Sequence, residues 1–350
     1  MNRFVLLALA GALGFVNAET ALAQAPKLEK PRIAISVGGS VSQMNKVAYF
    51  VALNRKYFEQ EGLTVDATNF SSGSAALQNL MGGNADVVEG AFEHTLRMQT
   101  KGIGLTCLAV YGRYAGNVLL VRKSEAGKIK TVADLKGRKI GVSSPGSATH
   151  NFVAGLMERS GVRWRDASFI SVGTGLSAVA AMRTGGELDA VVNLDPAINA
   201  LIDAGDALVL VDARTEEGTV AAFGSGGYLA DCMYVKTDFL KANPNTSQAV
   251  ANAIVHAMQW LKTASIDEII KSLPPEYYQA NEKLYRKSLE NNLSAFQWDG
   301  IVTNAAVKNV WDSIAVLEPE FRDSKVDFEK TYDNKLIERA LAKWKAPLAQ

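Results

Sequence analysis

Short apolar runs alternate with amphipathic stretches from Pro31 onward. Apolar runs of four to eight residues that end at glycine or serine predict strands, and apolar positions three or four apart predict helices. The pattern predicts strands over 33–37, 63–70 and 85–88, with a helix through Phe50 to about residue 58 and a second helix opening at 71–74. This β-α-β-α-β order implies parallel strands that are covered by helices.

The same order recurs about a hundred residues later, with strands over 139–143, 168–172 and 188–191 and helices over 150–159 and from 173–175. Four positions match at a common offset of 103: Ser74, Gly82, Gly83 and Asp86 correspond to Ser177, Gly185, Gly186 and Asp189. Any two βα units share some turn residues, but four matches in the same element order favour a duplicated architecture. We therefore expect two similar lobes.

Two further apolar segments, 117–123 and 226–235, are predicted to cross between the lobes. From Asp238 onward the pattern is mainly helical and contains no β-α-β unit, so this region is expected to pack back on the first lobe. The expected organisation is a first lobe built from 27–118 and 227–350, and a second lobe built from 119–226. Each lobe is an α/β unit with a mostly parallel sheet flanked by helices.

The first 23 residues have the features of a secretory signal peptide. Arg3 supplies the positive start, residues 4–16 are almost entirely apolar, and Ala21-Leu22-Ala23 is a small-x-small cleavage site. The apolar run is too short to span a membrane comfortably. We expect export to the periplasm with cleavage after Ala23.

Composition excludes several classes of protein. The 37 Lys and Arg residues nearly balance the 36 Asp and Glu residues, so no charged segment indicates a nucleic-acid or membrane partner. Three His and two Cys without a Cys-x-x-Cys pair are too few for a zinc ribbon, whereas a metal site built on carboxylates stays open as an alternative. Cys107 and Cys232 lie in two predicted strands: they are expected to be buried free thiols, and a disulfide is the alternative if these strands are neighbours.

Three segments form recognisable motifs: YFEQEGLTV at 57–65, the stretch from Ser72-Gly73-Ser74 to Asn84-Ala85-Asp86, and VADLKGRKIGV at 132–142, which Pro145-Gly146-Ser147 follows. Together they resemble the substrate-binding proteins of nitrate/sulfonate/taurine-type ABC transporters. The resemblance covers residues 31–262. It implies the type II periplasmic binding-protein fold and a monomeric trap without cofactor, which delivers a small solute to an inner-membrane permease and its ATPase.

In such a fold, ligands bind beyond the carboxyl ends of the strands, where the loops of both lobes face one cleft. Glycine lets the backbone approach a ligand, and helix starts with Ser or Thr supply N–H and O–H donors. Helix capping is the alternative role for the serines and threonines. The candidate ligand-binding residues are Gly39, Ser40, Gly73, Ser74, Phe92, Glu93, His94, Ser144, Ser147, Thr149, Thr174, Gly175 and Asp195.

Two acidic candidates bear on the ligand. Glu93 in the cleft would repel an anion and favour an amine or hydroxyl group, although a surface pair with His94 is the alternative. Asp195 occupies the equivalent position of the second lobe, where it could instead cap a helix. The two acids argue against a simple inorganic anion such as nitrate. We expect a small organic solute, with organic acids and sulfonates among the candidates.

Two other functions stay open at this point. The same fold class includes biosynthetic enzymes, but His94 and His150 are accompanied by no Gly-x-Ser-x-Gly elbow, and an export signal argues against cytosolic biosynthesis. We therefore expect no catalysis. The other alternative is the ligand-presenting subunit of a sensor, which would use the same cleft.

Overall fold

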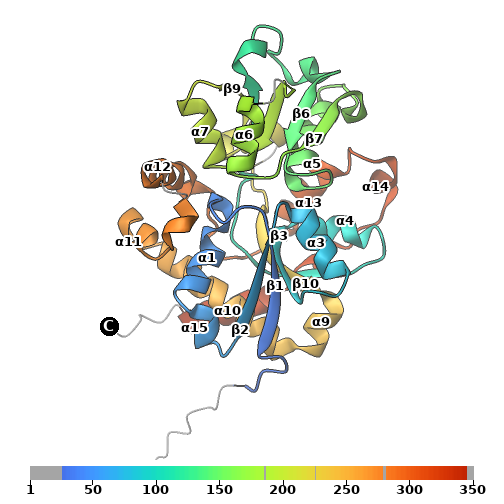
Figure 1. Ribbon diagram of the computed structural model, residues 1–350. Coiled ribbons are helices and arrows are strands. Elements are labelled where there is room, and N and C mark those ends of the chain that lie inside the picture. Colours follow the sequence, from blue (N-terminus) through green and yellow to red (C-terminus); the bar gives the residue numbers. More distant parts are fainter. Residues whose placement is uncertain (1–25, 185–186, 225, 279–280, 345–350) are drawn as a thin grey trace, which may run out of the picture.

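The computed structural model describes residues 26–184, 187–224, 226–278 and 281–344, which form two lobes, each with its own β-sheet (Figure 1). The predicted signal peptide and the Gly185-Gly186 pair of the sequence repeat lie outside the described residues. The expected two-lobed α/β architecture is confirmed.

The sheet of the first lobe has the strand order β2-β1-β3-β10-β4. Strand β1 runs parallel to β2 and β3, whereas β10 is antiparallel to β3 and β4. Ile33, Ile35 and Val37 alternate along β1 and are buried, as the period of two along a strand requires. The strand bounds are β1 (Arg32–Gly38), β2 (Thr64–Phe70), β3 (Val87–Ala91), β4 (Leu105–Val110) and β10 (Asp231–Lys236).

The sheet of the second lobe repeats this plan with the order β7-β6-β8-β5-β9. Its fourth strand, β5, is again antiparallel to both neighbours. The predicted crossing strand at 117–123 is therefore part of the second sheet, and the chain passes between the lobes at 111–117. The strand bounds are β5 (Val118–Arg122), β6 (Lys139–Val142), β7 (Ser168–Ser171), β8 (Ala190–Asn193) and β9 (Ala207–Asp212).

Helices follow the strands of each lobe. Those of the first lobe are α1 (Val47–Asn54), α2 (Tyr57–Gln60), α3 (Gly73–Met81) and α4 (Glu93–Gln99); those of the second are α5 (Ala148–Arg159), α6 (Leu176–Thr184), α7 (Ala197–Asp203) and α8 (Glu216–Phe223). The single helix expected to run to about residue 58 is wrong, because Lys56 adopts a left-handed conformation with a φ of 61° and separates α1 from α2.

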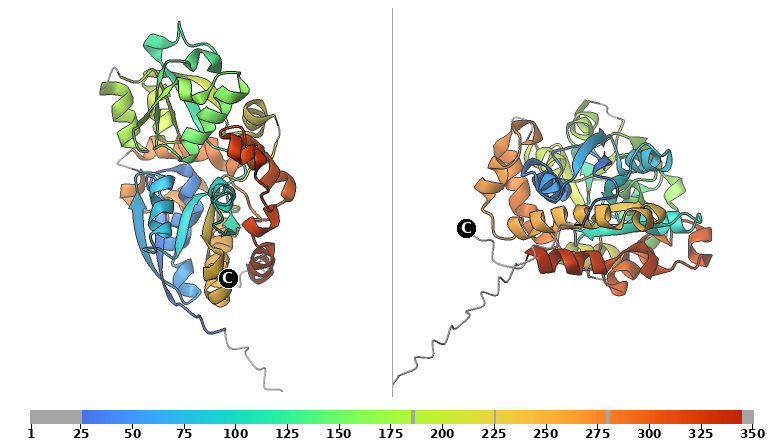
Figure 2. Two further views of the ribbon diagram at one scale, coloured as in Figure 1. Left: turned by 90° about the vertical axis from the view of Figure 1, so that its right-hand side faces the viewer. Right: turned by 90° about the horizontal axis from the view of Figure 1, so that it is seen from below.

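The C-terminal region is helical, as expected, and its long helix α10 packs with α15 on the first sheet. Its later helices also reach the second lobe, so the expectation that it packs on the first lobe alone is incomplete (Figure 2). Asn199 of α7 donates to Ser288 of α12 at 3.0 Å, and Arg165 pairs with Glu318 at 2.7 Å. The helix bounds are α9 (Thr237–Ala242), α10 (Pro244–Leu261), α11 (Ile266–Lys271), α12 (Glu282–Asn292), α13 (Asn304–Ile314), α14 (Pro319–Asp323) and α15 (Asn334–Trp344).

Single turns of 3₁₀ helix connect several elements. Their bounds are Met44–Lys46, Lys123–Glu125, Val132–Leu135, Trp164–Asp166, Pro275–Tyr278, Leu293–Ala295 and Phe328–Thr331. The first of these turns follows β1 and carries residues into the space between the lobes.

Candidate functional site

Two adjoining cavities of about 40 Å³ each lie between the lobes, and together we call them the cleft site. The residues that line both cavities are Asn45, Ala91, Ala148, Leu194 and Asp231. Three of them belong to the first lobe, whereas Ala148 and Leu194 follow strands β6 and β8 of the second. The site thus lies where the carboxyl ends of parallel strands from both lobes meet, and each cavity has room for a few water-sized groups.

Glycines shape one wall of the cleft site. Gly38 ends β1 and Gly73 begins α3, and both line one of the two cavities. A Cβ atom on Gly38 would lie 2.6 Å from the Cα atom of Gly73, closer than any real Cβ contact. Only glycine at position 38 lets the strand end and the helix start approach in this way.

A buried ion pair lies beneath this wall. The Lys46 ammonium donates to Glu89 at 2.6 Å and lies 3.8 Å from Asp231, while the Tyr111 hydroxyl donates to Glu89 at 2.5 Å. Burial lowers the pKa of Lys46, but attraction to Glu89 and Asp231 outweighs it and gives a net rise, so the amine stays charged. The positive charge of Lys46 is therefore already neutralised within the protein.

Two further carboxylates, Asp231 and Glu93, line the cavities themselves. Asn45 donates to Asp231 at 2.9 Å, and Asn151 of the second lobe donates to Glu93 at 2.5 Å. Burial raises the pKa of both carboxyls, and it outweighs the opposing influence of Lys46 on Asp231 and of Arg97 on Glu93. The ammonium of Lys46 thus serves two carboxylates, Glu89 and Asp231, while Glu93 is held by Asn151.

Several amide oxygens at the cleft site are buried without a hydrogen-bond partner in the described part of the chain. They are Oε1 of Gln43, Oδ1 of Asn45 and Oδ1 of Asn117. The orientations of the two asparagines are fixed, because their NH₂ groups donate to groups that only accept: the Asp231 carboxylate and the carbonyl oxygen of Ala115. The free positions of Asn45 and Asn117 are therefore acceptors. Buried polar atoms normally have hydrogen-bond partners, so buried amide oxygens without one indicate where a ligand can bind.

Five of the thirteen candidate residues line the cleft site: Gly73, Glu93, Ser147, Thr149 and Thr174. Two more candidate serines help to close the seam between the lobes beside it. The Ser74 hydroxyl lies 2.6 Å from the Ser144 hydroxyl, and the Ser74 N–H donates to the Ser147 hydroxyl at 3.1 Å. These contacts join the two lobes directly.

The remaining first-lobe candidates and Gly175 lie outside the lining of both cavities. The Ser40 N–H donates to the Thr174 hydroxyl at 2.8 Å, which places the Gly39-Ser40 loop against Thr174 and Gly175 at the seam. Phe92 and His94 are fully buried. Nδ1 of His94 hydrogen-bonds to the Tyr234 hydroxyl at 2.9 Å, and burial lowers its pKa to about 3, so the ring is neutral.

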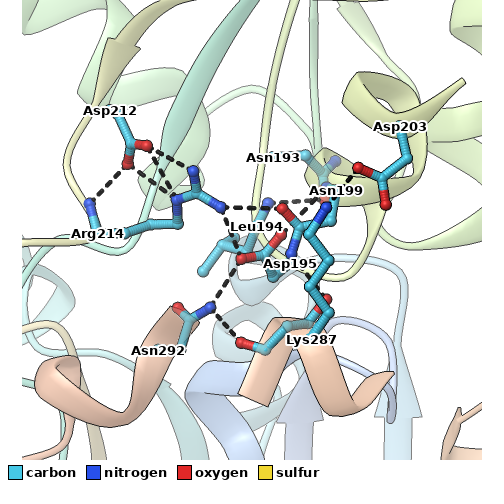
Figure 3. Close-up of polar contacts among 10 residues, drawn as sticks. Asn193, Leu194, Asp195, Asn199, Asp203, Asp212, Arg214, Lys287 and Asn292 are labelled. Carbon is cyan, nitrogen blue, oxygen red and sulfur yellow. Dashed lines mark hydrogen bonds and ion pairs between the residues drawn. The ribbon is translucent and has the colours of Figure 1, made fainter. Parts of the chain in front are cut away.

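Asp195 lies at the seam in a separate polar cluster, which we call the Asp195 network (Figure 3). Its carboxylate accepts from Arg214 at 2.9 Å, from Asn292 of α12 at 2.7 Å and from the N–H of Asn199 at 3.2 Å. Burial raises the pKa of Asp195 despite the attraction of Arg214. Asp195 thus joins the second lobe to a C-terminal helix.

Sequence reasoning missed the polar residues Gln43, Asn45, Lys46, Asn117 and Asp231 at the cleft site. Asp231 had a detectable signal, because it lies within the second predicted crossing segment, 226–235, and begins β10 of the structure. That strand is antiparallel to β3 and pairs Asp231 with Ala91, so its amino end lies beside the carboxyl end of β3. For the other four residues, no motif in the sequence indicated the site.

Three other features bear on function. In the described ranges, no group of three His, Cys, Asp or Glu side chains is placed to hold a metal ion. Cys107 and Cys232 are buried free thiols, although their strands β4 and β10 are neighbours. None of the described helices combines the length and the apolar character needed to cross a membrane.

Comparison with known proteins gives consistent matches. A family model described as NMT1/THI5 like matches residues 43–264. A solved structure of a protein from Bordetella bronchiseptica RB50 matches with 39% sequence identity and a TM-score of 0.87, over 91% of this chain and 100% of that chain. A search of curated proteins finds no match.

Two more distant structures bear on the fold. The alkanesulfonate-binding protein SsuA from Xanthomonas axonopodis pv. citri bound to MOPS matches with 20% identity and a TM-score of 0.65, over 90% of this chain and 99% of that chain. The periplasmic nitrate-binding protein NrtA from Synechocystis PCC 6803 matches with 14% identity and a TM-score of 0.70, over 92% and 91%. These likenesses show that the chain has the periplasmic binding-protein fold.

Proposed function

This chain belongs to the NMT1/THI5-like family, and on that premise we propose that it is the periplasmic solute-binding component of an ABC importer. It binds a small organic solute between its two lobes. The observation that carries this proposal is the cleft site: two cavities with polar walls, enclosed by direct contacts between the lobes. Structural relatives that bind alkanesulfonate and nitrate support the same function.

The proposal includes a transport cycle. The lobes open about the chain connection at 111–117 and about the segment that leads into β10, admit the solute, and close over it. The closed form then engages an inner-membrane permease with its ATPase. The protein works as a monomer and reaches the periplasm after cleavage behind Ala23, for which residues 1–23 provide the signal.

Binding without catalysis agrees best with the chemistry of the site. A hydrolase of the serine type needs a nucleophile within hydrogen-bond reach of a base. His94 contacts Tyr234 instead, and burial lowers the pKa of His150 to about 4. The lining hydroxyl of Thr149 is hydrogen-bonded to Ser143 at 2.8 Å rather than to a base. We therefore retain the solute trap and not the enzyme.

Replacement of Ser147 by Trp tests the trap. Ser147 is buried and lines a cavity of about 40 Å³, so an indole ring would fill that cavity or hold the lobes apart. We expect Ser147→Trp to stay folded but to lose the rise in Tm that a bound solute produces in the wild type. The solutes are first identified by native mass spectrometry of the purified protein and by a thermal-shift screen.

The matched control is Ser124→Trp, because Ser124 is exposed in the second lobe away from the cleft site. It should retain the full ligand-induced shift. Chromatography of each stabilising solute after incubation separates a trap from an enzyme, since a trap returns the solute unchanged at one equivalent. Unaltered stabilisation in Ser147→Trp, or turnover of the solute, would contradict the proposed function.

A further inference from the structure

We propose that the solute carries N–H donors on a positively charged group, such as a protonated amine or amidine, and is not an anion. This inference rests on the proposed function and names the class of solute for the same site. It follows from the balance of donors and acceptors at the cleft site, and it sets this protein apart from its anion-binding structural relatives.

The walls of the cleft site have an excess of acceptors. The carboxylates of Asp231 and Glu93 line the cavities, and the free amide oxygens of Asn45 and Asn117 add further acceptors. Because an amide or carboxylate oxygen cannot hydrogen-bond to another acceptor, the partner that completes these sites has to donate. A nitrate or sulfonate ion has only acceptor oxygens and would leave them unpaired.

Charge leads to the same conclusion. The buried cation nearest to the cavities is Lys46, and its ammonium is already held by Glu89 at 2.6 Å. Arg97 lies behind Glu93 on α4 and directs one guanidinium nitrogen to the carbonyl oxygen of Gly146 at 2.7 Å. An anion in the cleft would face Asp231 and Glu93 without a free cation among the lining residues, whereas a cation would be attracted by both.

The rest of the lining suits a small organic body. Ala91, Ala148 and Leu194 present apolar surface to both cavities, and Tyr228 adds an aromatic ring to one of them. The Thr174 hydroxyl on the opposite side already accepts from the Ser40 N–H. A compact solute with its donors toward Asn45 and Asp231 and its carbon atoms toward Leu194 therefore fits the site best.

Shape-matched probes of opposite charge test the proposal. Acetamidinium and acetate have the same planar outline, as do guanidinium and nitrate, but the first of each pair only donates and the second only accepts. At neutral pH, the two cations should raise the Tm of the purified, ligand-free protein, whereas acetate and nitrate should not. Native mass spectrometry should find a nitrogen-containing, basic solute in protein that has not been refolded.

Isosteric variants locate the effect. Asp231→Asn and Glu93→Gln remove a charge but keep an oxygen for the donating Asn45 and Asn151 side chains. Each should weaken acetamidinium binding by about tenfold to a hundredfold. The matched control is Asp195→Asn, which alters a buried carboxylate of the seam outside both cavities and should keep the preference for acetamidinium over acetate.

The outcomes distinguish a failure of the donor proposal from a failure of the proposed function. Stabilisation by acetate, nitrate or a co-purified sulfonate that Ser147→Trp abolishes would overturn the donor proposal but keep the solute trap. Cation stabilisation that survives both Asp231→Asn and Glu93→Gln would also overturn it. If nothing co-purifies and neither the probes nor a wider solute screen raises the Tm, the proposed function itself fails.

Discussion

The cleft site and the Asp195 network both bury carboxylates between the same two lobes, yet they differ in the hydrogen-bond and ion-pair partners that they give these carboxylates. In the Asp195 network, Arg214, Asn292 and the Asn199 N–H provide donors for one carboxylate. At the cleft site, the carboxylates of Glu89 and Asp231 share one ammonium, Glu93 accepts from Asn151, and nearby amide oxygens have no partner among the described residues. The Asp195 network thus supplies donors for its own buried acceptors, and the cleft site does not.

The difference separates a structural cluster from a binding site. Leaving a buried acceptor unpaired costs about 1–3 kcal/mol, which is a large share of the 5–15 kcal/mol that usually stabilises a folded protein. Folding alone therefore favours arrangements such as the Asp195 network. An acceptor-rich cavity between two lobes that can separate is best explained by a molecule that enters with its own donors.

Removal of the Lys46 charge should have the largest effect. Lys46→Met leaves Glu89 and Asp231 buried without a cation, so we expect the free energy of unfolding to fall by about 4 kcal/mol. Chemical denaturation measures this loss. The double variant with Glu89→Gln should recover part of it, because one unpaired charge is removed. A loss below about 1 kcal/mol would show that Lys46 does not neutralise the cleft carboxylates.

Asp195→Ala should cause the next largest loss of stability, but it should leave solute selection unchanged. It removes the carboxylate to which Arg214 and Asn292 donate, but Arg214 keeps its bonds to Asp212 and Asn292 keeps its bond to the Ser288 carbonyl, so we expect a loss of about 3 kcal/mol. The preference among bound solutes should not change. A variant that selects solutes of the opposite charge would place Asp195 in the binding site after all.

Much of the fold could be predicted from sequence, because glycines and small polar residues mark where the strands and helices end. The same rule located Gly73, Ser147, Thr149 and Thr174, since parallel strands direct their following loops to one edge. Asp231 escaped prediction because its strand runs antiparallel and reaches that edge with its amino end. Asp195 also follows a parallel strand, as this rule requires, but its carboxylate accepts a hydrogen bond from Asn292. The two residues are 97 positions apart in the sequence, so no local pattern predicts this contact.

Gln43→Leu should produce a smaller effect of the opposite sign. Oε1 of Gln43 is buried without a partner, so an apolar side chain of similar size should raise the stability of the ligand-free protein by about 1 kcal/mol. The same variant should weaken solute binding. Gln259→Leu is the matched control, since Gln259 donates to the carbonyl oxygen of Trp298 at 2.6 Å and its loss should destabilise. Destabilisation by Gln43→Leu would mean that the cleft acceptor is satisfied in the ligand-free protein.

The smallest effect should be a pH dependence confined to the cleft carboxylates. Burial raises the pKa of Glu93, so the folded protein binds this proton more tightly than the unfolded chain does. The stability that the protonated carboxyl contributes is present at acidic pH and is lost as the pH rises through the folded value. Wild type should therefore lose stability relative to Glu93→Gln as the pH rises above the ordinary Glu value.

Comparison with a variant is necessary because other groups also titrate. Burial lowers the pKa of His94 to about 3 and that of His150 to about 4, and both residues give the opposite slope below the ordinary His value of 6.5. Arg97 and Asp231, the charged groups that act on Glu93, are present in both proteins, so their influence largely cancels in the difference. Asp66→Asn provides the control: Arg32 holds the pKa of Asp66 below its usual range, so over the same interval its difference from wild type should be flat. A flat difference for Glu93→Gln as well would mean that burial does not raise the pKa of Glu93.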